Sequence, residues 1–251
     1  MTRSAKKTSK LTTDRDGNPV HNEILLVLPP VEAELLFSKL EFLQLKGRQL
    51  FHEAGQSIKS VYFVNSGLAS VLSVMSDGRS VEVGLIGKEG FVGLGIIAGF
   101  RRSSARVVAQ TDSTAFRLDA AVLDGILPRC PRLNRQLQRF SQMSAVQLTQ
   151  ISACNRLHKV DQRFARWLLM SHDRIGANVL PLTQEFLAQM LGTRRSSVTL
   201  AAVCLQKAGT ISYTRGHVTI LNRPALEKSA CECYRLIRHY LEESPTAPTI
   251  R

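Results

Sequence analysis

The 251-residue sequence lacks long apolar runs. Its first apolar segment, Ile24 to Leu28, ends at Pro29-Pro30 and is too short for a secretory signal. No later segment approaches the roughly 20 apolar residues of a membrane-spanning helix. Cysteine is also scarce, and 5 cysteines in a chain of this length do not suggest a disulfide framework. We therefore expect a cytoplasmic protein without a membrane partner.

Catalytic motifs are also missing. The sequence shows no P-loop, no Rossmann glycine fingerprint, no metal-ligand cluster and no spaced set of nucleophile, base and orienting group. Glu89, beside Gly90, is interpreted as a structural residue of a turn. These absences argue against an enzyme.

Negative charge is in short supply. The chain has 33 Lys and Arg against 20 Asp and Glu, a net charge of +13 and a pI of about 10.0. The last part, from Arg156 to Arg251, has 14 basic and 7 acidic residues and so carries +7. Such a charge favours a polyanionic partner, nucleic acid before an anionic membrane, although a merely soluble basic protein has the same composition.

The region from Gln49 to Leu118 has the pattern of short β-strands separated by glycines. Val81, Val83 and Leu85 alternate as on one face of a strand. Asp77-Gly78 predicts a hairpin with a type I′ turn, in which both central residues have positive φ. Many short strands with glycine turns are typical of an antiparallel barrel or jelly roll.

A long helix is predicted from Pro131 onward, because apolar residues recur there at spacings of mainly three and four. A helix of this length more often forms a seam between two subunits than a core helix of one small domain, and both alternatives remain open at this point. The residues expected at the subunit seam are Leu133, Leu137, Phe140, Val146 and Ile151.

The sharpest pattern lies between Thr183 and Leu221. Thr183 is suited to cap a first helix and Gly192 to end it, and Thr193 is suited to cap a second helix that runs toward Gly209. Two helices around a tight glycine turn form a helix-turn-helix unit. The segments "TISYTR" and "HVTIL" then predict a small hairpin, the wing.

The start of the second helix has the polar residues that a recognition helix presents to the major groove. Arg195 is suited to donate a pair of hydrogen bonds to guanine, and Arg194 to contact a phosphate or a flanking base. Without the neighbouring helix, turn and wing, the same residues would indicate only a solvated helix start. The predicted DNA-contacting residues are Thr183, Gln184, Thr193, Arg194, Arg195, Ser196, Ser197, Thr199 and Arg215.

These patterns resemble the Crp/Fnr family of bacterial transcription regulators over roughly residues 37–225. The resemblance rests on "LFHEAGQSIKSVYFVNSGLASVL", "GKEGFVGLG", the long helix and the unit from Leu182 to Leu221. It implies a β-roll sensor, a long dimer helix and a winged DNA-binding domain. It also implies a homodimer on a near-palindromic DNA site with half-sites about one helical turn, roughly 34 Å, apart, as in the catabolite activator.

The sensor departs from the cyclic-AMP-binding members of that family. Those members carry a glutamate for the ribose and an Arg-Ser pair for the cyclic phosphate. Leu94 stands at the glutamate position, Ser103 at the arginine position and Ser104 at the serine position. A buried phosphate would lose its charge-assisted partner, so we expect no cyclic AMP binding of the usual kind unless Arg101, Arg102 or Arg106 substitutes. The degenerate pocket is expected at Gly93, Leu94, Ser103 and Ser104.

The recognition helix departs from the family pattern too. Arg195 matches the family's first arginine, but Ser196 replaces a glutamate and Leu200 stands where a second arginine is common, which predicts a different target sequence. No metal or cofactor is expected. Oxygen-sensing members hold an iron–sulfur cluster with N-terminal cysteines, and this chain has none before Cys130. A metal at Cys231-x-Cys233 would need further ligands, so ordinary thiols are favoured there, and His52 is assigned a structural role.

The sequence thus predicts an α+β fold, with a flexible basic tail at residues 1–20, a cyclic-nucleotide-binding-like β-roll at 21–130, a dimerisation helix at 131–159, a winged helix-turn-helix at 160–230, and a C-terminal helix and tail at 231–251. The expected function is sequence-specific regulation of transcription. Expected partners are double-stranded DNA, a second copy of the chain and, as a candidate, RNA polymerase. The alternative is a nucleotide- or ligand-binding module that acts mainly through protein contacts.

Overall fold

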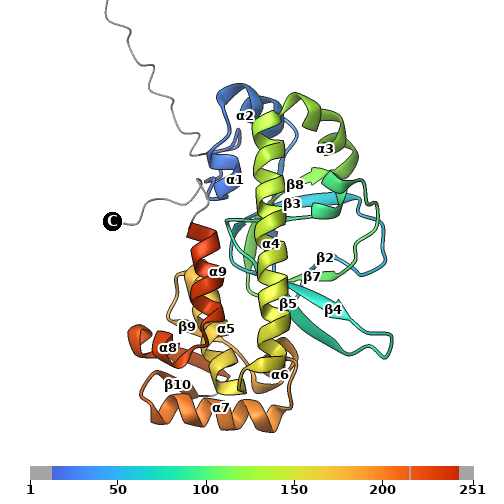
Figure 1. The fold of residues 1–251 in the computed structure, drawn as a ribbon. Helices are drawn as coiled ribbons and strands as arrows, with labels where there is room; N and C mark the ends of the chain where they lie inside the picture. The colour runs from blue at the N-terminus through green and yellow to red at the C-terminus, as the bar shows by residue number, and fades with distance from the viewer. Residues whose placement is uncertain (1–12, 215, 243–251) are drawn as a thin grey trace, which may run out of the picture.

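The computed structural model describes residues 13–214 and 216–242. Figure 1 shows a β-roll beside one long helix, and a helical unit with a small sheet at the far end of that helix. This arrangement of antiparallel sheets and separate helices confirms the predicted α+β fold class. Within the described ranges, every helix is too short or too polar to cross a lipid bilayer.

The β-roll begins with two short helices, α1 (Glu23–Leu26) and α2 (Pro30–Phe37), and closes with α3 (Ala120–Ile126) and the 3-10 turn η2 (Leu127–Arg129). Another 3-10 turn, η1 (Leu94–Ala98), lies between its strands. The strands are β1 (Glu41–Leu45), β2 (Leu50–His52), β3 (Ser60–Ser66), β4 (Ala69–Val74), β5 (Ser80–Ile86), β6 (Phe91–Val92), β7 (Arg106–Ala109) and β8 (Ser113–Asp119).

Two four-stranded antiparallel sheets form the roll, in the orders β1-β8-β3-β6 and β2-β7-β4-β5. Their facing sides enclose an apolar core that includes the fully buried rings of Phe63, Phe91 and Phe116. The first described residues belong to this domain, since Thr13 forms a β-bridge with Pro19 and Val20 is buried in the core. The described end of the expected tail is therefore packed on the roll, and residues 1–12 lie outside the described part.

The β4–β5 hairpin confirms the prediction made from Asp77-Gly78, but its turn is of another type. Met75 and Arg79 are joined by a backbone hydrogen bond of 2.8 Å, and Gly78 has a φ of 84°. Asp77 keeps a negative φ, so the two-residue type I′ turn expected from the sequence is wrong. A three-residue loop with one left-handed glycine closes the hairpin instead.

Strand β5 is buried in a way that alternation did not predict. Val81 and Val83 are half-buried, whereas Glu82 between them is only 3% exposed. The sheet is covered on both sides here: the other half of the roll lies on one face, and α4 and the C-terminal unit lie on the other. A side chain on the expected solvent face therefore becomes enclosed.

Helix α4 (Pro131–Leu157) crosses the whole molecule (Figure 1). Leu133, Leu137 and Phe140 are buried in the core of the roll, and Ile151 is buried in a second core at the C-terminal end. Val146 is half-buried. These five residues, expected at a subunit seam, face the chain's own domains in this structure. A second copy would have to contact the opposite, exposed face of α4.

The C-terminal unit is built on α5 (Val160–Ile175), whose Phe164, Trp167 and Leu168 are fully buried. Its remaining elements are β9 (Val179–Pro181), α6 (Gln184–Leu191), α7 (Arg195–Lys207), β10 (Ile211–Thr214), β11 (His217–Ile220), α8 (Arg223–Ser229) and α9 (Cys233–Glu242). The three strands form an antiparallel sheet in the order β10-β11-β9.

Candidate nucleic-acid interface

Helices α6 and α7 form the helix-turn-helix that the sequence predicts. The Thr183 hydroxyl accepts a hydrogen bond from the Phe186 backbone N–H at 3.2 Å, which confirms the predicted cap of α6. Gly192 ends α6 with φ 58° and ψ 44°, as expected for a left-handed C-cap. The predicted cap of the second helix is wrong by one residue: α7 starts at Arg195 and its N-cap is Arg194, because the Thr193 N–H is still bonded to the Ala188 carbonyl.

The inner faces of this unit hold it as one body. Leu187 and Leu191 of α6 pack with Val198 and Leu205 of α7 in the C-terminal core. The wing strands β10 and β11 lie against the helices, and the Tyr213 hydroxyl donates to the Leu182 carbonyl at 2.9 Å. The polar faces of α6 and α7 are thereby oriented by a rigid support.

The polar residues at the start of α7 face solvent. Arg194, Arg195 and Ser196 are exposed, and the Arg195 Nε donates to the Gln184 Oε1 at 3.2 Å. Leu200, one turn further on, is 69% exposed, which leaves an apolar side chain on the outer face of the helix. The structure places the other predicted contact residues around this face: Thr183 and Thr199 are exposed, and Gln184, Thr193 and Ser197 are half-buried. Arg215 lies outside the described residues.

The β-roll contains a cavity of about 380 Å³ at the position of the expected ligand pocket. Its lining is mainly apolar, with Val71, Ile86, Phe91, Leu94 and Phe100 among its walls. All four pocket residues expected from the sequence are part of it: Gly93, Leu94, Ser103 and Ser104. His52 also lines it but is held by the Ser60 carbonyl at 2.7 Å, and burial lowers the pKa of its imidazole.

Polar groups that could hold an anionic phosphate in this cavity are engaged elsewhere. The Ser103 hydroxyl donates to the Ala105 carbonyl at 2.7 Å, and Arg102 donates to the Gly55 carbonyl at 2.9 Å. Arg101 pairs with Asp124, and Arg106 pairs with Glu53 at 2.9 Å. Of the three arginines considered as substitutes, only Arg102 is among the lining residues described for this cavity.

Comparison with protein families identifies both halves of the molecule. Residues 42–130 match the cyclic nucleotide-binding domain, and residues 162–229 match the Crp-like helix-turn-helix domain. The chain has the two domains of a Crp/Fnr-type transcription regulator. Members of this family are transcription regulators, which confirms the function class expected from the sequence.

Individual relatives agree with this assignment. The fumarate and nitrate reduction regulatory protein of Yersinia pestis is 26% identical over 204 residues, covering 74% of this chain and 76% of that protein. FixK2 from Bradyrhizobium japonicum shares the fold with a TM-score of 0.66 at 16% identity, over 76% of this chain and 98% of its own. The c-di-GMP-responsive regulator CLP of Xanthomonas campestris does so with a TM-score of 0.64 at 18% identity, over the same shares, 76% and 98%.

The β-roll is in direct contact with the helix-turn-helix unit. Gln189 of α6 donates to the Ser80 hydroxyl of β5 at 2.8 Å, and a Cβ added at Gly192 would lie 2.7 Å from Val81. The Trp167 indole N–H donates to Glu82 at 2.7 Å inside the protein. Burial raises the pKa of Glu82 to about 7. A movement of the β4–β5 hairpin would therefore alter contacts with helix α6 of the helix-turn-helix.

Glu89 joins the two halves at a second place. Its carboxylate pairs with the Arg174 guanidinium at 2.7 Å and accepts the Gly87 N–H at 3.1 Å. Both side chains of the pair are almost enclosed, at 14% and 5% exposure. These contacts give Glu89 the structural role expected from the sequence.

A cluster of cysteines and histidine lies where α4 meets the C-terminal helices. Cys154 and His158 come from the end of α4, and Cys231 and Cys233 from the junction of α8 and α9. The Cys154 and Cys231 sulfurs are 3.4 Å apart, and this contact lowers the pKa of the Cys154 thiol. Sequence reasoning missed the cluster because the two pairs are distant in the chain, and the expectation of ordinary buried thiols at Cys231 and Cys233 is not confirmed.

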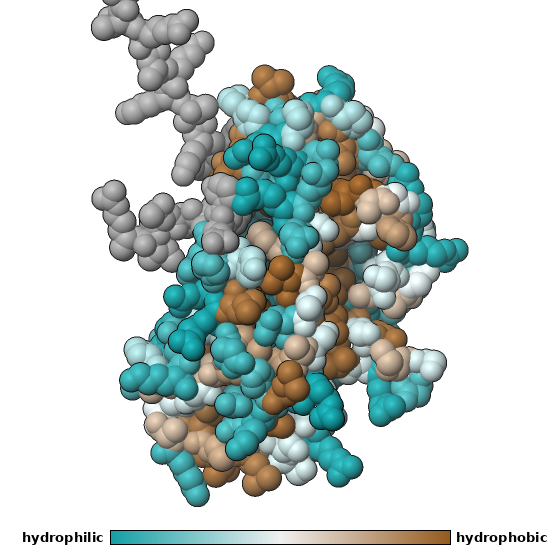
Figure 2. Space-filling view, viewed as in Figure 1, coloured by the Kyte–Doolittle hydropathy of each residue, from teal (hydrophilic) through white to brown (hydrophobic). Residues whose placement is uncertain are grey.

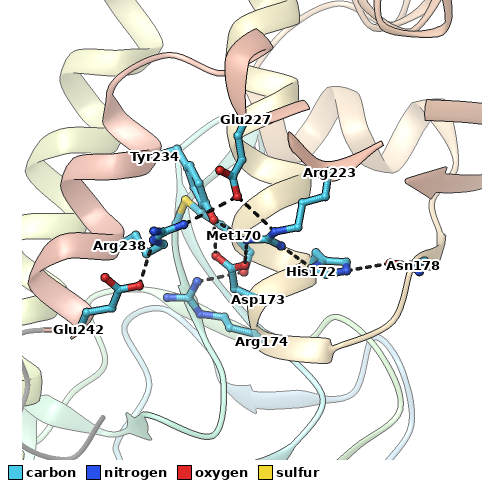
Figure 3. A network of polar contacts seen from close by, with 10 residues as sticks. All are labelled: Met170, His172, Asp173, Arg174, Asn178, Arg223, Glu227, Tyr234, Arg238 and Glu242. Atoms are coloured by element: carbon cyan, nitrogen blue, oxygen red, sulfur yellow. Dashed lines mark hydrogen bonds and ion pairs between the residues drawn. The ribbon is translucent and has the colours of Figure 1, made fainter. Parts of the chain in front are cut away.

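Helices α8 and α9, which lie on either side of Cys231, are fixed to α5 by a polar network (Figure 3). Asp173 of α5 accepts hydrogen bonds from Arg223 of α8 at 2.6 Å and from the Tyr234 hydroxyl of α9 at 2.9 Å. Arg238 of α9 bridges to Glu227 of α8 at 3.7 Å. Since α5 also supports α6 and α7, the C-terminal helices and the helix-turn-helix form one unit.

Proposed function

We propose that the protein is a homodimeric, sequence-specific transcription regulator that acts in the cytoplasm and does not require cyclic AMP of the usual kind. The observation that carries this proposal is the first turn of α7. It presents Arg194, Arg195 and Ser196 to solvent from a rigid helix-turn-helix, flanked by a wing. Placed in the major groove, this end of a recognition helix reads base edges.

Each residue of this face has a distinct proposed role. Arg195 reads a guanine through O6 and N7, and Arg194 contacts a phosphate or a flanking base. The exposed Leu200 packs on a thymine methyl group, the apolar feature of the major groove. The DNA backbone is held by hydroxyl, amide and guanidinium groups, those of Thr183, Gln184, Thr193, Ser197, Thr199 and Arg215.

The exposed face of α4 is the proposed contact with a second copy. Gln138, Gln142, Ala145, Leu148 and Ser152 are exposed at spacings of three and four residues. Figure 2, drawn from the same side as Figure 1, shows apolar residues in brown gathered down the middle of the face that α4 crosses. The small side chains of Ala145 and Ser152 and the apolar Leu148 would let two α4 helices approach closely and place two recognition helices on one side of the DNA.

The sensor cavity favours an apolar occupant, or none, over a cyclic nucleotide. Leu94 replaces the carboxylate that would bind a ribose, and Ser103 replaces the guanidinium that would bind the phosphate. A ligand can change DNA binding only if it binds two states of the sensor with different affinity. The hairpin contact from Ser80 and Val81 to α6 is the path by which such a difference would reach the helix-turn-helix.

Selection of bound sequences from a random DNA pool tests this function, with purified protein in the presence and absence of cyclic AMP. The proposal predicts a two-fold symmetric motif that is recovered equally under both conditions. Recovery only with cyclic AMP would overturn the assignment of Leu94 and Ser103. A protein with Arg194→Ala and Arg195→Ala that keeps full regulatory activity in cells would favour the alternative, a ligand-binding module that acts through protein contacts.

A further inference from the structure

Four potential metal ligands converge at the joint between α4 and the C-terminal unit. Cys154 lies in the last turn of α4, and His158 is its C-cap residue. Cys233 is the first residue of α9 and Cys231 lies just before that helix, 77 positions after Cys154 in the chain. One donor atom from each of the four lies within 4.8 Å of all the others. Cys154 Sγ lies 3.4 Å from Cys231 Sγ, and Cys233 Sγ lies 3.5 Å from His158 Nδ1.

We propose that Cys154, His158, Cys231 and Cys233 form a tetrahedral site for one Zn²⁺ ion. At Zn–S distances of about 2.3 Å, neighbouring sulfurs of a tetrahedral site are roughly 3.8 Å apart, which matches the spacing of these donors. Three thiolates and one imidazole are a closed structural set, and soft sulfur ligands disfavour Mg²⁺ and Ca²⁺. In a four-iron cluster each ligand binds a different iron, which requires donors farther apart than these.

The surroundings of the four residues are those of a ligand set. His158 directs Nδ1 toward Cys233 and places Nε2 3.1 Å from the Glu232 carboxylate, the arrangement that orients metal-bound histidines. Gln150 donates its amide to the Cys233 sulfur at 3.1 Å. The three cysteines of the site cluster with one another and are separate from both apolar cores. By contrast, Cys130 lies within the core of the β-roll, and Cys204 is exposed.

An ion at this site would join the long helix to the DNA-binding unit. Only His158 and Lys159 separate α4 from α5, so the angle between them depends on contacts beside this break. The network of Figure 3 fixes α8 and α9 to α5, and the metal would fix their junction to the end of α4. This bracing role rests on the proposed function, because it concerns the orientation of α7, whereas metal binding itself does not depend on it.

Elemental analysis of the purified full-length protein, with an assay for acid-labile sulfide, tests the site. We expect about one zinc per chain and no sulfide. Zinc should be lost from the Cys231→Ser and His158→Gln variants and retained in Cys204→Ser, the matched control. Glu232→Gln should weaken zinc affinity by about tenfold. Cobalt added to the metal-free protein should give the visible absorption of a tetrahedral site with thiolate ligands.

The site assignment would be overturned if the protein bound neither zinc nor cobalt, or if it contained iron with sulfide. To test the bracing role, DNA affinity is measured before and after a chelator removes the zinc and again after zinc is restored. We expect a reversible loss of roughly tenfold. An unchanged affinity in a protein that does bind zinc would refute the bracing role alone. A zinc-loaded protein that selects no DNA sequence would refute the proposed function and leave the metal site standing.

Discussion

Replacement of Arg195 by alanine is the sharpest test of the reading face. Arg195 is exposed at the first position of α7, and its only described side-chain partner is Gln184, also near the surface. Loss of this contact should therefore change the free energy of unfolding by no more than about 0.5 kcal/mol. The main effect should appear in DNA binding, because a bidentate arginine–guanine contact contributes about 1–3 kcal/mol of discrimination.

In a dimer the contact occurs twice, so the Arg195→Ala protein should lose about 2–6 kcal/mol on its selected site, at least roughly 30-fold in affinity. The assay is fluorescence anisotropy with the selected duplex and with duplexes changed at one base pair at a time. The Arg195→Ala protein should no longer discriminate at the base pair that Arg195 reads. It should bind the selected duplex and the duplexes changed at that base pair with equal, weak affinity. Lys207→Ala, at the far end of the same helix, is the control for loss of one positive charge.

Arg194→Ala provides the contrast. Because Arg194 is proposed to contact a phosphate, its replacement should weaken binding to all duplexes about equally. It should also lower the slope of log affinity against log salt by about 1 per chain. The account of Arg195 would be refuted if its replacement weakened every duplex equally, as expected for Arg194, or left all affinities unchanged.

Three further predictions concern stability and assembly. The pKa of Glu82 is raised from 4.5 to about 7, so the folded state binds more protons than the unfolded state between these pH values. The free energy of unfolding should therefore fall by up to about 3 kcal/mol as the pH rises through this window. Denaturant titrations of the Glu82→Gln protein should show no such pH dependence. Leu148→Glu places a charge on the exposed face of α4 and should convert the proposed dimer into monomers in sedimentation experiments, whereas Val31→Glu, which adds the same charge at an exposed position of α2, should leave the assembly unchanged. Gly192→Ala should cost about 1 kcal/mol or more in thermal unfolding, because Gly192 has φ 58° and the new Cβ would meet Val81 at 2.7 Å; an unchanged melting temperature would contradict the described packing.

Local signals made much of this fold predictable. The cap at Thr183, the end of α6 at Gly192 and the hairpin at Asp77-Gly78 each depend on a few adjacent residues, and the structure shows all three. The type of the hairpin turn was not predictable, since Asp-Gly suits both a two-residue turn and a three-residue loop. The N-cap of α7 was displaced from Thr193 to Arg194 because a backbone bond to Ala188 prolongs the turn.

Features that depend on distant contacts were not visible in the sequence. Glu82 alternates with valines as a solvent-facing residue would, but α4 and α6 pack on β5 and the Trp167 indole of α5 donates to its enclosed carboxylate. The apolar residues of α4 indicated a buried face but not what covers it, and Leu133 and Leu137 are covered by the β-roll of the same chain. Cys154 and Cys231 meet only after the C-terminal helices fold back on α4.

The central claim, a dimer that reads two half-sites through α7, is tested most directly by hydroxyl-radical footprinting on the selected DNA. The account predicts two protected half-sites on one face of the duplex, about 34 Å apart from centre to centre. Protection should disappear in the protein with Arg194→Ala and Arg195→Ala at concentrations that saturate the wild type. Equal footprints from both proteins, or a single protected half-site bound by one chain, would contradict the claim.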